Sequence, residues 1–230
     1  MGHSGYPKIE YRFVDHVRYL DAFLDSVLPT GEMFLVVQDW GSALGLHWAH
    51  RYSERVIGIV LMEFIRPFPT WEDVGPSKEA QGIFKAFRTP ETGRKLLIED
   101  NVFLTQILPG GIIRKLGAEE QEYYRHPFLS QSSREPVYRW PNELPISHHP
   151  PDVWDIVSNY RSWLMKTDIP KLLFYTTPGA FVTPEKARWY EMNMENVRLV
   201  DLGDGVHYLQ EDHPRRIGEE TADFMRALLL

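Results

Sequence analysis

Residues 33–42 read Met-Phe-Leu-Val-Val-Gln-Asp-Trp-Gly-Ser, and they contain the most informative pattern of the chain. The apolar run 33–38 predicts a strand buried on both faces of a parallel sheet. The residues from Gly41 to Tyr52 have helical spacing of their apolar side chains. Asp39 therefore lies on a strand–turn–helix junction, the context of a nucleophile elbow, where a tight turn raises one side chain above the sheet. The structural alternative is that Asp39 only caps the helix.

The pattern around this junction is that of an α/β protein. A second apolar run, residues 55–62, follows the helix at the distance typical of a strand–helix–strand unit, which predicts a parallel sheet. A helix over residues 15–28 precedes the unit. The same alternation returns late in the chain, with helices predicted over 152–165, 184–192 and 215–230, and strands over 171–175 and 197–202.

The middle of the chain has a different texture. Eleven of the 17 prolines fall between Pro67 and Pro151, and proline cannot continue a helix interior. Residues 69–150 hold several short helical patterns and no convincing strand. We therefore predict three parts: a first part of the α/β core (1–68), a helical cap or lid (69–150) and a second part of the core (151–230).

Composition excludes several classes of protein. The 230 residues are 43% hydrophobic and 25% charged, as in ordinary globular proteins, with 30 aromatic residues. The net charge of −7 comes from mixed signs without a basic stripe, so no nucleic-acid partner is expected. No apolar run has the ~18 residues of a membrane span. There is no cysteine, and His47 and His50 lack further ligands, so no metal site is expected.

Two more residues fit a catalytic constellation with Asp39. Glu63 follows the second predicted strand, and His207 follows the strand at 197–202. Ligands of open parallel sheets lie outside these carboxyl ends. The chain order nucleophile, acid, histidine is that of α/β-hydrolases. Taken singly, Glu63 also fits a surface carboxylate and His207 a solvated loop histidine; their joint occurrence at strand ends favours catalysis.

These motifs resemble the haloalkane dehalogenases, a branch of the α/β-hydrolases. The resemblance runs over nearly the whole chain and rests on VVQDWGSALGLHWAHR, MEFIRPFPTW, FRTPETGRKLLIEDNVFL, REPVYRWPNELPI, PKLLFYTTPG and GDGVHYLQEDHP. It implies an α/β-hydrolase fold with a helical cap, in which Asp39 is the nucleophile, Glu63 the triad acid and His207 the base. Trp40 matches the tryptophan that holds the halide. The residues that it suggests for the substrate pocket are Phe84, Phe103, Ile107, Pro141, Leu144, Ala180 and Phe181.

The resemblance also implies the chemistry. Asp39 would displace halide to form an alkyl ester, and water activated by His207 would hydrolyse that ester. The expected partners are a small halogenated hydrocarbon, a halide ion and water, with no cofactor and no metal. We expect a cytoplasmic protein. Epoxide hydrolases share the Asp–Trp pair and use a pair of lid tyrosines, for which Tyr123 and Tyr124 are candidates.

One family motif is missing. No His-Gly-Asn occurs in the chain, although the family's asparagine at that motif is a second halide donor. The start, MGHSGYP, resembles the loop that follows the family's first strands. We therefore expect that the N-terminal part of the sheet is missing and that apolar strand edges are exposed, which favours association or an oligomer. A catalytically dead fragment that only assembles with a partner is the alternative.

Overall fold

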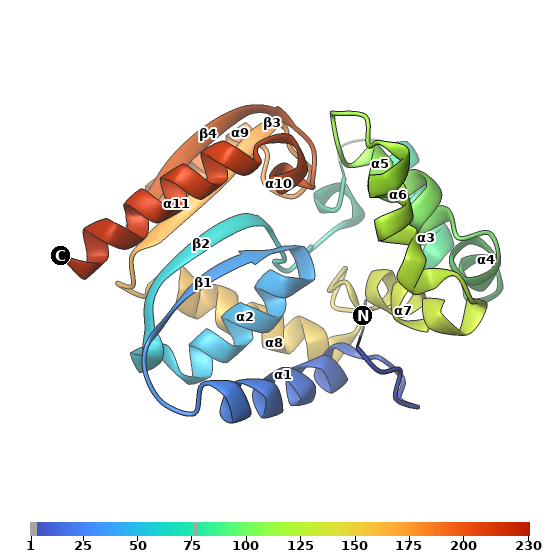
Figure 1. The fold of residues 1–230 in the computed structure, drawn as a ribbon, viewed down its shortest axis with the longest axis horizontal. Coiled ribbons are helices and arrows are strands. Elements are labelled where there is room, and N and C mark those ends of the chain that lie inside the picture. Colours follow the sequence, from blue (N-terminus) through green and yellow to red (C-terminus); the bar gives the residue numbers. More distant parts are fainter. Residues whose placement is uncertain (1–3, 76–77) are drawn as a thin grey trace.

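The computed structural model describes residues 4–75 and 78–230, and at its centre lies a four-stranded sheet (Figure 1). The strands are β1 (Met33–Gln38), β2 (Val56–Phe64), β3 (Lys171–Pro178) and β4 (Val197–Gly205). They lie in the order β1-β2-β3-β4 and every pair is parallel. The predicted α/β class and its parallel sheet are confirmed. Strands β3 and β4 each run three residues beyond the predicted end, because they pair with each other as far as Pro178 and Gly205.

Helices cover both faces of the sheet. One hydrophobic cluster joins Ile59 and Leu61 of β2 to residues of α2 (Asp39–Arg51), α8 (Pro151–Leu164) and α9 (Pro184–Asn193). A second cluster joins Val60 and Met62 of the same strand to α11 (Pro214–Leu229) and to the four-residue α10 (Leu209–Asp212). Successive side chains of a strand point to opposite faces, which explains why neighbouring residues serve different clusters. These helices were predicted from the sequence, except α10, which is too short to show a helical pattern.

The predicted lid region is made of short helices, gathered on the right of Figure 1. They are α3 (Lys78–Phe87), α4 (Pro90–Arg94), α5 (Leu108–Gly110), α6 (Ala118–Arg125) and α7 (Glu135–Glu143), with π-helical turns at Lys95–Glu99 and Phe103–Ile107. Prolines 90, 109 and 136 each occupy a first helical turn, where the missing N–H costs nothing. This region, residues 69–150, is called the lid below, and it has a small apolar cluster of its own. The exact boundaries at residues 68 and 150 stay a prediction.

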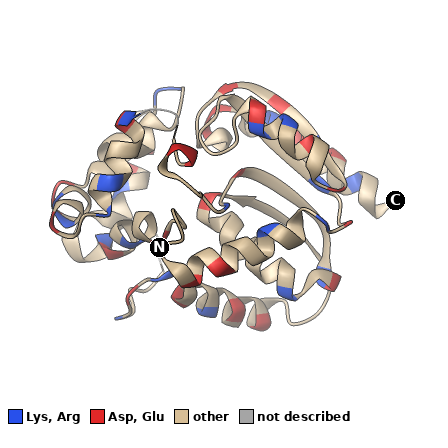
Figure 2. Ribbon diagram, turned by 180° about the vertical axis from the view of Figure 1, so that it is seen from behind, with Lys and Arg blue, Asp and Glu red and all other residues tan. Residues whose placement is uncertain are grey.

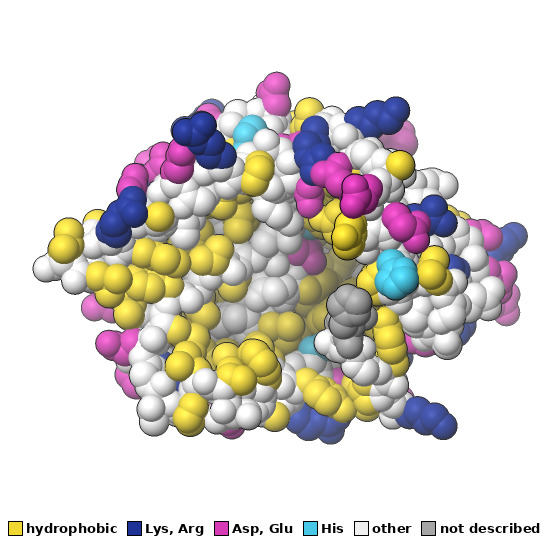
Figure 3. All heavy atoms as spheres, viewed as in Figure 1, with side chains coloured by type: hydrophobic (Ala, Val, Ile, Leu, Met, Phe, Trp, Pro, Cys, Tyr) yellow, Lys and Arg dark blue, Asp and Glu magenta, His cyan; other side chains and the backbone are white. Residues whose placement is uncertain are grey.

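The prediction that β1 is buried on both faces is wrong. No residue of β1 is buried, and Val36 is 47% exposed. The physical reason is that β1 pairs only with β2 in the described part of the chain, so it is an edge strand. Helix α1 (Phe13–Val27), which packs beside α2, also leaves Phe23 and Val27 largely exposed. Figure 3 shows hydrophobic side chains over the face that carries β1 and α11.

Charges are spread over the outer surfaces of the helices. In Figure 2, Lys and Arg alternate with Asp and Glu along the same helices, so this view has no continuous patch of one sign. In the part of the chain that the structure describes, none of the helices has the length and apolar character needed to cross a membrane.

The exposed edge of β1 leads to a first prediction. Unpaired backbone groups on an uncharged edge strand are a template for pairing with another chain, and a lysine on the strand opposes such pairing. We expect the chain to associate reversibly with rising concentration, and Val36→Lys to shift the distribution toward monomer. Sedimentation velocity measures both. Val27→Lys, which adds the same charge to an exposed site on α1, is the matched control; equal distributions for both variants would contradict the role of β1.

Candidate active site

Glu63, near the carboxyl end of β2, is a fully buried acidic residue. Its side chain has no exposed surface, and its two oxygens accept the backbone N–H groups of Ala180, Phe181 and Val182 at 3.2, 2.6 and 3.1 Å. These three donors lie in the loop between β3 and α9. A buried carboxylate is stable only when its oxygens are satisfied in this way. The alternative of a surface carboxylate is therefore wrong for Glu63.

His207 lies between Glu63 and Asp39. Its Nδ1 is 3.2 Å from Glu63 Oε2, and its Nε2 is 3.2 Å from Asp39 Oδ1. Burial by itself lowers the pKa of His207, but the hydrogen bonds to Asp39 and Glu63 outweigh this effect and raise that pKa from 6.5 to about 10. The two carboxylates on either side of the ring thus favour the imidazolium form of His207. A solvated loop histidine does not describe it, because only 16% of its side chain is exposed.

Backbone conformation brings the two acids to the same edge of the sheet. Asp39 and Glu63 both have left-handed backbones, with φ of 47° and 40°, which residues other than glycine adopt at a cost of about 1–3 kcal/mol. Ser42 helps to hold the turn: its hydroxyl donates to the Asp39 carbonyl and accepts the Ile65 N–H at 2.9 Å. The strained turn at Asp39 and the helix that starts there are the features of a nucleophile elbow.

The lid holds the loop that carries His207. The carbonyl of Gly111 accepts the backbone N–H groups of both His207 and Tyr208, each at 3.0 Å. A few residues on, the Asp212 carboxylate accepts the backbone N–H groups of Ile113 and Arg114 at 3.0 and 2.9 Å. The position of His207 relative to Asp39 therefore depends on contacts with the lid as well as on Glu63.

Trp40, the first residue after Asp39, lies at the same turn. The residue is 8% exposed. Its indole stacks on Trp140 of α7, with ring centroids 4.6 Å apart, and Phe13 contacts it from α1. Within residues 4–75 and 78–230, no group accepts a hydrogen bond from the Trp40 indole N–H. An indole N–H is a donor only, so in these apolar surroundings it is suited to an anion.

The seven predicted pocket residues are placed differently. The Phe181 ring contacts His207, with centroids 5.3 Å apart, and the Ala180 N–H serves Glu63. Phe103 packs in the lid cluster beside Tyr208, while Phe84 and Leu144 belong to the larger core cluster. Pro141 is buried, and its carbonyl accepts a hydrogen bond from the Arg88 side chain. Ile107 is half-buried. The structure brings Ala180 and Phe181 to Glu63 and His207. Among the described residues, the contacts given above do not join the other five to the triad. The whole set stays a prediction.

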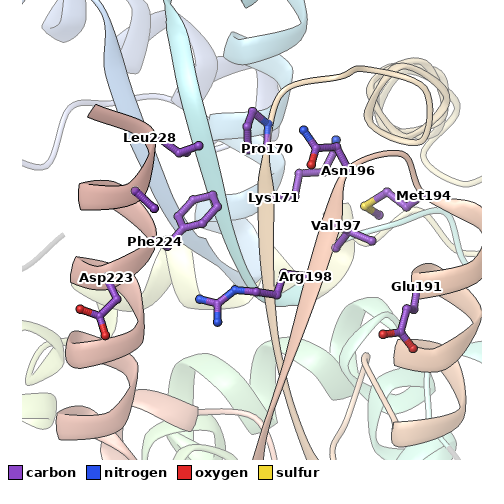
Figure 4. Close-up of a pocket in the computed structure, with 11 residues that line it drawn as sticks. Pro170, Lys171, Glu191, Met194, Asn196, Val197, Arg198, Asp223, Phe224 and Leu228 are labelled. Atoms are coloured by element: carbon purple, nitrogen blue, oxygen red, sulfur yellow. The ribbon is translucent and has the colours of Figure 1, made fainter. Parts of the chain in front are cut away.

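A cavity of about 710 Å³ lies elsewhere, at the opposite end of the strands (Figure 4). Residues from the start of β3, the start of β4 and the end of α11 line it, and none of the predicted site residues is among them. Nor does any group of three or more His, Cys, Asp or Glu residues in the described ranges form a metal-binding cluster. The arrangement around Asp39 is therefore the candidate active site.

Gln38, the last residue of β1, also contacts His207, and it was not predicted as a site residue. Its side-chain Nε2 donates to the His207 carbonyl at 3.1 Å and lies 3.2 Å from the Nε2 of the His207 ring. Its place directly before Asp39 was the only available signal, because the His207 loop is 169 residues away in the chain.

The fold and this site define an α/β-hydrolase. A model of the alpha/beta hydrolase fold matches residues 1–77. A haloalkane dehalogenase from Mesorhizobium japonicum is 47% identical over 229 residues, which cover 100% of this chain and 74% of that relative. Another from Bradyrhizobium diazoefficiens is 44% identical, with 99% and 76% covered. The crystal structure of the haloalkane dehalogenase DbeA from Bradyrhizobium elkani superimposes with a TM-score of 0.96 at 41% identity, covering 99% of this chain and 78% of the other.

The chain belongs to the haloalkane dehalogenase family. The resemblance inferred from the sequence motifs is thus confirmed, as is the expected class of enzyme, a hydrolase that acts on carbon–halide bonds. The relatives are longer than this chain, which spans about three quarters of their length.

The burial of Glu63 leads to a second prediction. Glu63→Gln places an amide NH₂ against backbone N–H donors and leaves buried hydrogen-bonding groups unsatisfied, which typically costs about 1–3 kcal/mol and more where a charge is involved. We expect the free energy of unfolding to fall by about 2–3 kcal/mol, measured by urea denaturation. The control Glu191→Gln, at an exposed position, should change it by less than about 0.5 kcal/mol. A Glu63→Gln variant as stable as the control would contradict the role of the three N–H donors.

Proposed function

We propose that this chain carries out hydrolytic dehalogenation of haloalkanes through Asp39, His207, Glu63 and Trp40. The observation that carries the proposal is the contact of His207 with both acids, Nε2 to Asp39 and Nδ1 to Glu63, each at 3.2 Å. A nucleophile, a base and an orienting acid in this order are the parts that covalent hydrolysis needs. The substrates are a small halogenated hydrocarbon and water, and no cofactor takes part.

In the first step, a carboxylate oxygen of Asp39 attacks the carbon that bears the halogen. A carbon–oxygen bond forms, and the carbon–halogen bond breaks with its electron pair leaving on the halide. A carboxylate needs no base to activate it, so His207 can remain protonated. The Trp40 N–H donates to the departing halide, whose developing charge is stabilised more strongly in surroundings that exclude water.

After the ester has formed, His207 releases its Nε2 proton to solvent. In the second step, the neutral His207 takes a proton from water, and the resulting hydroxide attacks the carbonyl carbon of the Asp39 ester. The tetrahedral intermediate collapses and releases the alcohol, which receives the proton from His207. The carboxylic acid of Asp39 then passes its proton to His207, which restores the starting carboxylate and imidazolium. In total, haloalkane and water become alcohol, halide and the proton that His207 released. Glu63 keeps His207 oriented and stabilises its cation.

Epoxide hydrolysis is not favoured. It requires lid tyrosines that can protonate the epoxide oxygen, yet Tyr123 is 75% exposed and the Tyr124 hydroxyl donates to Glu211. The relatives named above are dehalogenases.

The family pattern pairs the tryptophan with a second halide donor, the asparagine of a His-Gly-Asn motif. These 230 residues contain no His-Gly-Asn. Loss of one such donor typically costs about 10²–10³ in rate. We therefore propose that this chain alone works slowly, and that the segment present in its longer relatives raises the rate of halide release.

The test of this proposal is the Asp39 ester. In His207→Phe, alkylation proceeds but the base is missing, so a brominated alkane should add one alkyl group and release one bromide per chain. Intact mass and peptide mapping detect the ester on Asp39, and Asp39→Asn should form none. His126→Phe, at an exposed lid position, is the matched control and should not accumulate ester.

The experiment is run on the chain alone and on the chain fused behind the uncovered part of the Mesorhizobium relative. Ester in both forms supports the complete proposal. Ester that forms only in the fused protein would show that the residues are assigned correctly and that the added segment is necessary. This result is expected for a fragment that is inactive by itself. No ester in either form would refute the proposed nucleophile.

The pKa of His207 gives a further prediction for pH dependence. The Asp39 carboxylate is one of the groups that raise this pKa to about 10, and alkylation removes its charge. The pKa of His207 must then be lower in the ester than in the free enzyme. We expect ester formation to change little between about pH 6 and pH 9, and ester hydrolysis to accelerate with pH through the lowered pKa. Rapid-quench mass spectrometry separates the two steps; a hydrolysis rate independent of pH would contradict His207 as the base.

A further inference from the structure

We infer that Gln38 is a positioning residue that donates a hydrogen bond to His207 in its neutral form and so prepares it to act as the base after Asp39 is alkylated. The inference rests on the proposed function, and it assigns a role to a residue outside the triad. Gln38 ends β1, one position before Asp39, and its side chain reaches across to the loop after β4.

The orientation of the Gln38 amide follows from its partners. Its nitrogen lies 3.1 Å from the His207 backbone carbonyl, which can only accept a hydrogen bond. The NH₂ group, and not the amide oxygen, must therefore face His207. The same nitrogen is 3.2 Å from the ring Nε2 of His207, and its second hydrogen is free to be donated there. Gln38 thus meets the ring as a donor.

The ring nitrogens of His207 can satisfy these partners in two ways. Nδ1 faces the Glu63 carboxylate, an acceptor, and so it keeps its proton in both forms. When Nε2 is protonated, it donates to Asp39 Oδ1 at 3.2 Å. When Nε2 carries a lone pair, it accepts from Gln38. Asp39 and Gln38 therefore favour opposite protonation states of the same atom.

Alkylation of Asp39 changes this balance. The ester has no negative charge and is a weaker acceptor than the carboxylate, so it stabilises the His207 cation less. The donor on Gln38 is unchanged by the reaction. The net effect is that His207 gives up its Nε2 proton when the ester has formed, which is the stage at which a neutral base is needed. The incoming water then replaces Gln38 as the donor to Nε2.

The other charged groups around His207 do not change during this cycle. Glu63 faces Nδ1 from β2, and the Tyr208 ring lies against the imidazole, with a phenol whose pKa is raised by burial so that it stays neutral. The lid contributes the uncharged Gly111 carbonyl. The two acids of α10 are engaged with the lid: Glu211 forms an ion pair with Arg114, and Asp212 accepts backbone N–H groups. Among these groups, the variable one is Asp39 and the opposing donor is Gln38.

A substrate-free experiment isolates the effect. Asp39→Asn imitates the charge of the ester, and in that background the pKa of His207 is measured by ¹⁵N NMR with Gln38, Gln38→Met and Gln38→Glu. Removing the donor should raise the pKa by about one unit, and replacing it with a carboxylate should raise it further. Gln121→Met is the matched control, because Gln121 also donates its amide to a backbone carbonyl, that of Leu116, in the lid.

The second readout uses the enzyme with Asp39 intact. At pH 7, Gln38→Met should slow ester hydrolysis about tenfold, which corresponds to one pH unit, and leave ester formation within about twofold. Raising the pH should restore the rate, which loss of structure alone would not produce. Equal His207 pKa values with and without the Gln38 amide would overturn the inference. Failure of the Asp39 ester to form would refute the proposed function instead, and the NMR result would still decide the role of Gln38.

Discussion

The arrangement of the candidate site depends on one buried charge. Glu63 has lost all contact with solvent, and removing such a carboxylate from water is costly unless its oxygens are fully paired. Three consecutive backbone N–H groups and His207 supply that pairing. This pairing brings the end of β2, the loop after β3 and the loop after β4 together at Glu63. The contact with Glu63 then fixes the His207 imidazole in front of Asp39.

The rest of the fold holds the residues around Glu63 in place. Parallel strands bring their carboxyl ends to one edge, so residues from distant parts of the sequence meet there. Helix α2 begins at Asp39 itself, and Ser42 ties its first turn to the segment after β2. The lid contributes a second restraint through Gly111, whose carbonyl holds the backbone of His207. Catalysis by a carboxylate and an imidazole requires geometry of this kind more than it requires any cofactor.

The local sequence pattern was sufficient to predict the strands, the junction at Asp39 and the positions of Glu63 and His207 at strand ends. The features that could not be predicted depend on neighbours from other parts of the chain. The apolar run of β1 looked like a central strand, because sequence alone does not show how many neighbours a strand has. The three donors to Glu63 are backbone groups and leave no signature in residue type. Gln38 carries an ordinary amide whose meaning comes only from the His207 loop.

In the proposed mechanism, water attacks the carbonyl carbon of an Asp39 ester rather than the substrate carbon. A single turnover in H₂¹⁸O, using the form of the chain that releases bromide, distinguishes these two routes. We expect ¹⁸O in the carboxylate of the peptide containing Asp39, while the alcohol carries the ordinary oxygen that Asp39 supplied. An ¹⁸O-labelled alcohol together with an unlabelled Asp39 peptide would contradict it.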